Sequence, residues 1–546
     1  MDSDAKRVVL ALVISVAVLF AWTTFVMPPE PKQAPAPTAT PAQTAQATAA
    51  APAPAAMPAP APAPQVMPAY QDVVVETPLM RATFSTKGGA LRKVVLKDYF
   101  AKPGQQGGEM VLLDLADSEP YALGLALVKL DPHLAQRPFQ ASAQRLEVTA
   151  AGQSLSFSAE SAGVRVVKTY TFRPDSHAFQ LSVSLQNKNA GRIELTPELI
   201  LAEYVSKMHA NSYAFTGSQV VAGGSLEELD HGDLEDSPVV AGPIDCLTLS
   251  IPYFMGAVAP ESWPAVAQGK PSARGWADAK LMTATLVSPL LPMDAGQSLD
   301  LKFLVYYGPK ELHVLEPLGH SLAMAVDFGW FDVIAKPMLA GLNFFHDYVN
   351  NYGVAIIIIT VLIKLLFWPL QNKSYESMKK MQKLQPQIAK IREKYKDDKQ
   401  EMNQQVMQLY KTYKVNPLGG CLPMLAQVPV FIAFYKVLGS SIELRHAPFW
   451  LWINDLSAPD RLPIGFEIPF VGDGIPVLTL LMGASMFITQ KMSPATGDPT
   501  QQKMMMLMPV IFTVMFINFP SGLVLYWFVQ NLLGIGQQWL VNRRKD

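Results

Sequence analysis

The chain has 546 residues, of which 50% are hydrophobic and only 16% are charged, and its mean hydropathy is +0.17. A soluble protein normally carries about 25% charged residues, so this composition favours a membrane protein with a soluble part. The formal net charge of −1 identifies no class of partner. The two cysteines and eight scattered histidines form no HxxxH or CxxC pair, so the sequence predicts no metal site.

The N-terminal region begins with Lys6 and Arg7, followed by an apolar run at residues 8–27. This run is longer than the apolar core of a signal peptide, so we predict a retained signal anchor at residues 1–27 with its basic end in the cytoplasm. Cleavage as a signal peptide remains the alternative. Residues 28–69 are rich in Ala, Pro, Thr and Gln, a composition that cannot bury a core and that predicts a disordered tether.

Residues 70–310 have a hydrophobic period of two, which predicts strands. Residues 164–172 and 178–186 are expected to form a hairpin across a turn. Residues 223–236 have the composition of a solvated acidic loop. The region as a whole predicts an all-β domain, most simply a large sandwich. Further strands are expected at residues 73–84, 90–96, 155–159, 192–198 and 299–307.

Residues 311–351 return to the spacing of a helix. Trp330 and Lys336 suit a helix that lies in the membrane interface. The alternative is a helix packed on the β-domain. The residues expected on one face are Phe331, Ile334, Met338, Leu342 and Phe345.

The last part of the chain, residues 352–546, contains five apolar segments, and loop charge orients them. Eleven basic and five acidic residues lie between residues 371 and 416, whereas residues 440–474 hold two basic and five acidic residues. With the first segment included, six spans place both termini in the cytoplasm and the β-domain outside. Cys246 and Cys421 then lie on opposite sides, so no disulfide is expected. The five spans are expected at about residues 353–370, 418–438, 475–490, 504–519 and 522–538.

Residues 374–415, between two of these spans, predict a cytoplasmic helical hairpin that packs as a short coiled coil. Its turn is expected at residues 396–399, and Pro386 is expected in the first turn of the first helix, where no amide donor is needed. Its basic surface suits RNA or anionic lipid, although a run of charges is usually just a solvated face. The apolar positions are Leu384, Ile388, Ile391, Tyr395, Met402, Val406, Leu409 and Tyr413.

Polar residues within the apolar segments are the candidate functional groups. A charge in mid-membrane costs about 2.5–3.5 kcal/mol on insertion scales, so Lys364 is a candidate for a functional role. Its side chain either faces a polar interior or extends to the cytoplasmic headgroups, about 9 Å away along the helix, and spacing does not separate these interpretations. No GxSxG, P-loop or HExxH motif is present, so neither an enzyme nor a cofactor is predicted. The other polar residues are Thr360, Gln427, Gln530 and Asn531.

Four motifs resemble the YidC/Oxa/Alb family of membrane protein insertases: 416–438 (NPLGGCLPMLAQVPVFIAFYKVL), 490–494 (QKMSP), 508–516 (MPVIFTVMF) and 519–531 (FPSGLVLYWFVQN). The order of the predicted segments follows the Gram-negative form, which has a large periplasmic domain. The resemblance implies a five-helix core whose hydrophilic groove opens to the cytoplasm and to lipid. It places Lys364 in that groove, where arginine is usual; lysine keeps the charge but lacks the bidentate fork. Thr360, Tyr526 and Trp527 match substrate-contact positions, and Gln427 and Gln530 would line the groove.

The resemblance further implies an insertase and chaperone that moves apolar segments of new proteins into the inner membrane, alone or with the Sec translocon. Its implied partners are nascent membrane proteins, the ribosome, the Sec translocon and membrane lipid, with no DNA and no cofactor. Two other functions are weighed against it. A secondary transporter would show internal repeats, and none is visible. A membrane-anchored periplasmic binding module would leave five spans and the basic hairpin unexplained.

Overall fold

The computed structural model describes residues 70–543, except 106, 117–118, 205–214, 263–271, 278–280, 414, 416–421, 470 and 493–498. The predicted signal anchor (1–27) and tether (28–69) therefore lie outside the described residues, as does Cys421. The described part consists of a β-rich domain, from Asp72 to Pro309, followed by a helical region up to Arg543.

Alternation of apolar and polar residues produces the strands of the β-rich domain. In β9 (Val164–Phe172) every second side chain is buried, because successive side chains point to opposite faces of a sheet. This strand pairs in antiparallel register with β10 (Ala178–Asn187), and their pairing confirms the predicted hairpin. Apolar residues from all three large sheets meet in one buried core, so the prediction of a β-rich domain is confirmed.

The β-domain contains three sheets of five or more strands. The largest has the strand order β14 (Ser225–Asp230), β13 (Gly217–Ala222), β16 (Ile244–Ser250), β17 (Phe254–Ser262), β21 (Ser298–Pro309), β10, β9, β8 (Gln153–Ser161), β6 (Gln140–Ala141). The second has the order β15 (Val239–Ala241), β18 (Ser272–Ala277), β19 (Leu281–Val287), β12 (Pro197–Tyr204), β5 (Gly124–Leu127). The third has the order β4 (Glu109–Asp114), β3 (Ala90–Phe100), β2 (Met80–Ser85), β1 (Asp72–Glu76), β7 (Arg145–Glu147). A small pair joins β11 (Ile193–Leu195) and β20 (Leu291–Met293).

Three local predictions in this domain are wrong. Residues 192–198 contain not one strand but β11 and the start of β12, which belong to different sheets. Residues 73–84 form not one strand but the hairpin β1–β2, because the Thr77 hydroxyl accepts hydrogen bonds from the Leu79 and Met80 amides and closes a turn. Residues 223–236 are not a loop, because they contain the edge strand β14 and the short helix α2 (His231–Glu235). Reciprocal hydrogen bonds between Asp230 and Asp233 cap that helix, so its acidic residues stabilise regular structure.

Helix α4 (Asp332–Val349) follows the β-domain after α3 (Leu312–Leu315) and short 3₁₀ turns at Glu316–Leu318, Leu322–Ala325 and Gly329–Phe331. The helix buries Ala335, Met338, Leu339 and Leu342. It packs mainly against α5 and α7 of the helical region, described below. The structure therefore does not support the alternative in which this helix packs on the β-domain.

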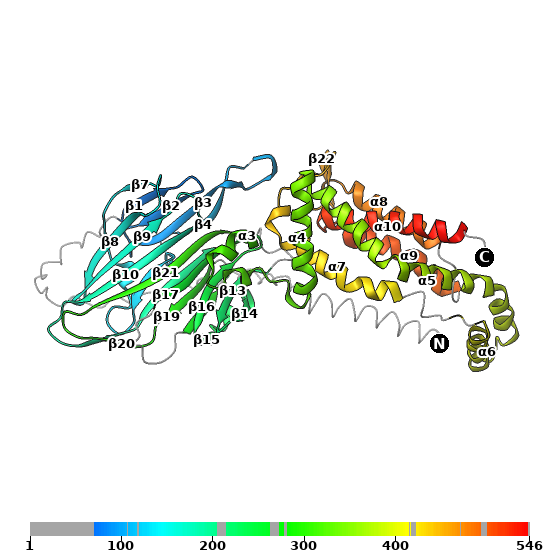
Figure 1. The fold of residues 1–546 in the computed structure, drawn as a ribbon, viewed down its shortest axis with the longest axis horizontal. Helices are drawn as coiled ribbons and strands as arrows, with labels where there is room; N and C mark the ends of the chain where they lie inside the picture. Colours follow the sequence, from blue (N-terminus) through cyan, green and yellow to red (C-terminus); the bar gives the residue numbers. More distant parts are fainter. Residues whose placement is uncertain are drawn as a thin grey trace, which may run out of the picture. The chain divides into compact units, whose positions relative to one another are not determined.

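Helix α5 (Tyr352–Lys394) runs without interruption from its apolar half into the first helix of the hairpin (Figure 1). The expectation that Pro386 begins a separate helix is wrong, because both Pro369 and Pro386 lie inside α5. The second hairpin helix is α6 (Lys399–Thr412), capped by the Asp398 carboxylate. Apolar contacts between the two helices form their own small core. Its members are Met381, Leu384, Ile388 and Val415, with Val406, Leu409 and Tyr410 packed against them.

Four more helices complete the helical region: α7 (Leu422–Ser440), α8 (Val477–Met492), α9 (Pro499–Phe516) and α10 (Ser521–Arg543). Helix α10 packs against α5, α7 and α8, and α8 packs against α9. Among the described helices, only α5 is both long and apolar enough to cross a membrane by itself. Shorter apolar stretches occur at Leu425–Ser440, Val477–Met492 and Met505–Phe516.

The segment between α7 and α8 contains the strand pair β22 (Leu462–Ile468) and β23 (Gly472–Ile475), and its first residues contact the β-domain. The Arg445 guanidinium donates a 2.7 Å hydrogen bond to the carbonyl of Phe100, at the end of β3. It also lies 5.5 Å from the ring centre of Phe254. Ile442 is 4% exposed and belongs to the buried core of the β-domain.

Glu203, on β12, is an acidic residue buried inside the β-domain. It is 1% exposed, and its Oε1 accepts a 3.1 Å hydrogen bond from the Tyr204 amide. Its Oε2 has no hydrogen-bond partner among the described residues. Burial raises the pKa of this carboxyl from 4.5 to about 8. The folded chain therefore favours the neutral acid.

The stability of the β-domain is expected to fall as the pH rises from about 4.5 to about 8, because folding then requires Glu203 to remain protonated. Glu203→Gln keeps the acceptor for Tyr204 and cannot ionise. The variant should gain up to about 4 kcal/mol over the wild type at pH 8 and little at pH 4. Denaturant unfolding at the two pH values measures this difference. Glu160→Gln at an exposed position is the control, and an equal gain at both pH values would contradict the prediction.

Candidate functional site

Lys364 lies on the interior face of α5. The residue is 2% exposed, whereas its neighbours Leu365 and Leu366 are 57% and 74% exposed. Its Nζ atom lies 3.5 Å from the position that a Cβ atom would occupy at Gly534 of α10. The Tyr375 hydroxyl lies 3.6 Å from the same point. Because Gly534 has no side chain, there is space on α10 next to the Lys364 ammonium group.

Thr360 lies one helical turn before Lys364 and is fully buried. Its hydroxyl donates a 2.6 Å hydrogen bond to the carbonyl of Ile356 in the same helix. A threonine bonded in this way is satisfied without a partner from another helix. Thr360 therefore adds a small polar surface beside Lys364 at little energetic cost.

Gln427 of α7 and Gln530 of α10 carry buried amide atoms for which the described part of the chain supplies no hydrogen-bond partner. The Nε2 atom of Gln427 and both amide atoms of Gln530 lack hydrogen bonds among the described residues. The next residue, Asn531, donates a 3.0 Å hydrogen bond to the Ser485 hydroxyl of α8. A buried amide without a partner costs about 1–3 kcal/mol, and such groups are normally satisfied by water or a polar ligand. Gln427 and Gln530 thus provide unused hydrogen-bonding capacity inside an apolar bundle.

Tyr526 and Trp527 belong to aromatic contacts between helices. The ring of Tyr526 lies 4.6 Å from that of Phe434 in α7. The ring of Trp527 lies 4.8 Å from Phe431 of α7 and 5.0 Å from Phe516 of α9. The structure therefore places this pair where α10 meets α7 and α9. Lys364 instead faces α10 at Gly534. Lys364 and the aromatic pair therefore lie at two different helix contacts.

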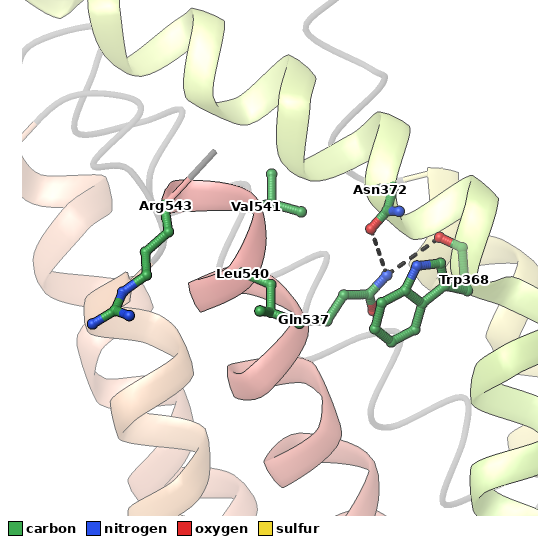
Figure 2. Close-up of a pocket in the computed structure, with 6 residues that line it drawn as sticks. All are labelled: Trp368, Asn372, Gln537, Leu540, Val541 and Arg543. Carbon is green, nitrogen blue, oxygen red and sulfur yellow. Dashed lines mark hydrogen bonds between the residues drawn. The ribbon is translucent and has the colours of Figure 1, made fainter. Parts of the chain in front are cut away.

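A polar cluster at the C-terminal end of α10 was not predicted from the sequence. The Gln537 Nε2 atom donates hydrogen bonds to the carbonyl of Trp368 at 3.2 Å and to the Oδ1 atom of Asn372 at 2.8 Å. Figure 2 shows Gln537 beside these two residues, with Arg543 pointing away from them. They line a pocket of about 290 Å³ between α5 and α10. Lys364, Trp368 and Asn372 recur every four residues, a spacing that could have identified this face of α5.

The fold and these polar groups can now be compared with known proteins. A family model described as YidC periplasmic domain matches residues 72–340, and one described as 60Kd inner membrane protein matches residues 344–546. A membrane protein insertase YidC of Syntrophobacter fumaroxidans is 43% identical over 486 residues, covering 87% of this chain and 86% of that protein. One of Geotalea daltonii is 41% identical over 547 residues, covering 98% of this chain and 99% of that protein.

A β-rich periplasmic domain joined to a helical inner-membrane region defines a membrane protein insertase of the Gram-negative type, which is not an enzyme. The chain belongs to the YidC family. Membership confirms the resemblance noted in the sequence. The roles of Lys364 and the other candidate residues remain predictions.

The space at Gly534 yields a prediction about the lysine. An alanine there meets the Lys364 ammonium and the Tyr375 hydroxyl at ordinary contact distances, so Gly534→Ala should retain insertion activity. Gly534→Leu has to displace both groups and should lower the insertion rate at least about tenfold, a barrier change of about 1.4 kcal/mol. The measurement is protease protection of a substrate tail in proteoliposomes. Gly536→Leu, where a Cβ meets nothing within 4 Å, is the matched control. Equal activity of Gly534→Leu and the control would contradict the prediction.

Proposed function

We propose that this insertase moves apolar segments of newly made proteins from a polar groove, open to the cytoplasm, into the inner-membrane lipid, and helps them to fold. The groove lies among α5, α7, α8, α9 and α10. One observation carries the proposal. Lys364 is buried on the interior face of α5, in a bundle where the Nε2 atom of Gln427 and both amide atoms of Gln530 lack hydrogen-bond partners among the described residues. A sealed apolar bundle would gain nothing from these groups. A hydrated groove uses all of them.

The energetic role of the groove follows from the cost of moving polar groups through hydrocarbon. Each unsatisfied backbone group in lipid costs several kcal/mol. A polar groove that reaches part of the way across the membrane shortens the apolar path of a translocated tail. Lys364 attracts acidic residues of that tail, and burial of the substrate's apolar segment in lipid then drives the step. Tyr526 and Trp527 would contact the substrate where α10 meets α7 and α9.

The proposed topology has six spans, with both termini in the cytoplasm and the β-domain in the periplasm. The excess of basic residues between residues 371 and 416 supports it. Helix α8 has 16 residues, which is about 24 Å of helix against a hydrocarbon core of about 30 Å. A span of this length thins the bilayer locally. Thinning lowers the barrier to insertion in the same way as the groove.

The proposed cytoplasmic partner is the ribosome, at the basic hairpin of α5 and α6, and the Sec translocon is a second proposed partner in the membrane. The first helix of the hairpin is part of the same helix as Lys364, because α5 runs without a break from Tyr352 to Lys394. A substrate delivered at the hairpin therefore arrives beside the helix that carries the groove charge.

The proposed function is tested by reconstitution. The purified chain is placed in liposomes and given a small membrane protein with one or two spans and an acidic translocated tail. The expected result is protease protection of the tail that depends on the insertase. Equal protection with empty liposomes would contradict the proposal. Saturable uptake of a small solute would favour a secondary transporter.

The charge at residue 364 yields a second prediction in the same assay. Lys364→Arg keeps the positive charge and should retain insertion. Lys364→Glu should lower insertion at least about tenfold for an acidic tail, and less for a neutral tail, because it replaces attraction with repulsion. Lys373→Glu, an equal change of charge at an exposed position of the same helix, is the control. If all four proteins are equally active, Lys364 has no electrostatic role in insertion.

A further inference from the structure

One face of α4 exposes an apolar stripe, which Asp347 borders near the C-terminal end of the helix. Val333 and Tyr348, near its two ends, are 86% and 72% exposed. The opposite face of the helix packs against α5 and α7. A continuous exposed apolar stripe is unfavourable in water and suits contact with lipid acyl chains. The stripe consists of Val333, Pro337, Ala340, Phe344 and Tyr348, at intervals of four, three, four and four residues.

A pocket of about 440 Å³ opens at the N-terminal end of this stripe. Glu228 of the edge strand β14 lines one part of it, and Asp327, Asp332 and Lys336 line another. Trp330, which also lines it, is fully exposed. Tryptophan prefers the boundary between lipid and water, because its ring is apolar and its N–H is polar. The charged lining of the pocket therefore lies next to an apolar surface that suits contact with lipid.

The carboxylates of this pocket are held in place and retain capacity for a ligand. Glu228 accepts a 2.8 Å hydrogen bond from the amide of Gln219, and Asp327 accepts a 3.1 Å hydrogen bond from the Gly329 amide. A carboxylate accepts several hydrogen bonds, so both can accept more. Neither carboxylate forms a hydrogen bond or salt bridge with a lysine or arginine among the described residues.

Two lysines bring positive charge to the same pocket. The Lys336 ammonium lies 2.6 Å from the Asp332 carboxylate within the lining. The Lys436 ammonium, from α7, lies 3.3 Å from the position that a Cβ atom would occupy at Gly329. The pocket thus presents carboxylates and ammonium groups together. A ligand that matches it carries both signs of charge.

We propose that this pocket binds the headgroup of an ethanolamine phospholipid from the outer leaflet of the inner membrane. The lipid phosphate pairs with Lys336 and Lys436. The lipid ammonium donates hydrogen bonds to Glu228 and Asp327, and the acyl chains lie along Trp330 and the α4 stripe. A choline headgroup has the same charges but no N–H donors, so it cannot satisfy the two carboxylates. A purely anionic headgroup leaves them facing like charge.

The test measures lipid binding to the delipidated full chain by native mass spectrometry. Phosphatidylethanolamine, phosphatidylcholine and phosphatidylglycerol with identical acyl chains are compared. The wild type should bind the ethanolamine lipid at least about fivefold more tightly than the choline lipid, because only the ethanolamine ammonium can donate hydrogen bonds to the two carboxylates. Equal binding of the two would overturn the proposal.

Neutral variants locate the preference. Glu228→Gln and Asp327→Asn keep the oxygens that accept from Gln219 and Gly329, so both should fold. Each should reduce the preference for ethanolamine over choline, and the double variant should abolish it. Glu227→Gln, at the next position of the edge strand, is the matched control and should behave as the wild type. A preference unchanged in the double variant would overturn the assignment to this pocket. If free phosphoethanolamine binds as tightly as the phospholipid, the ligand of the pocket is a soluble zwitterion and the lipid assignment is overturned.

Discussion

The burial of one ammonium group inside an apolar helix bundle is the constraint on which the rest of the membrane region depends. A buried charge loses several kcal/mol of hydration, and packing alone does not restore it. Here the missing side chain of Gly534 leaves space next to Lys364. The amides of Gln427 and Gln530 add polar atoms that have no hydrogen-bond partner within the described ranges. A dry core would leave these groups unsatisfied, at a cost of about 1–3 kcal/mol each. Water or a polar chain among the helices would therefore stabilise their interior.

A second contact between α5 and α10 lies where α5 leaves the bundle. Pro369 removes one backbone donor from the helix just beyond Lys364. The Gln537 amide donates hydrogen bonds to Trp368 and Asn372, which lie on either side of this proline. Helix α10 therefore contacts α5 both before and after the position of the missing donor. The first helix of the hairpin is thereby linked to the helix that carries Lys364 by an unbroken run of α5, which α10 contacts on both sides of the proline.

Local patterns in the sequence were sufficient where neighbouring residues determine the structure. The hairpin of β9 and β10 follows from alternation within twenty-odd residues, and the core motifs led to the family. Predictions failed where one local signal hid another: the acidic residues of β14 concealed an edge strand, and Pro386 lies inside a helix that its tertiary contacts keep intact. The contact between Lys364 and Gly534 could not be predicted, because it depends on how two helices far apart in the sequence pack. The sequence contains Lys364 and Gly534, but it does not indicate that the two residues lie close together.

Contacts of Arg445 and Ile442 argue against treating the β-domain as an independent appendage. Ile442 lies in the segment after α7, yet its side chain completes the buried core of the β-domain. Arg445, three residues later, gives a hydrogen bond to Phe100 and lies over the ring of Phe254. Separating the two regions would expose the apolar side chain of Ile442, which is unfavourable, and would exchange the Arg445 hydrogen bond for hydrogen bonds to water. Because Ile442 closely follows α7, which carries Gln427, this contact connects the β-domain to a helix of the proposed groove.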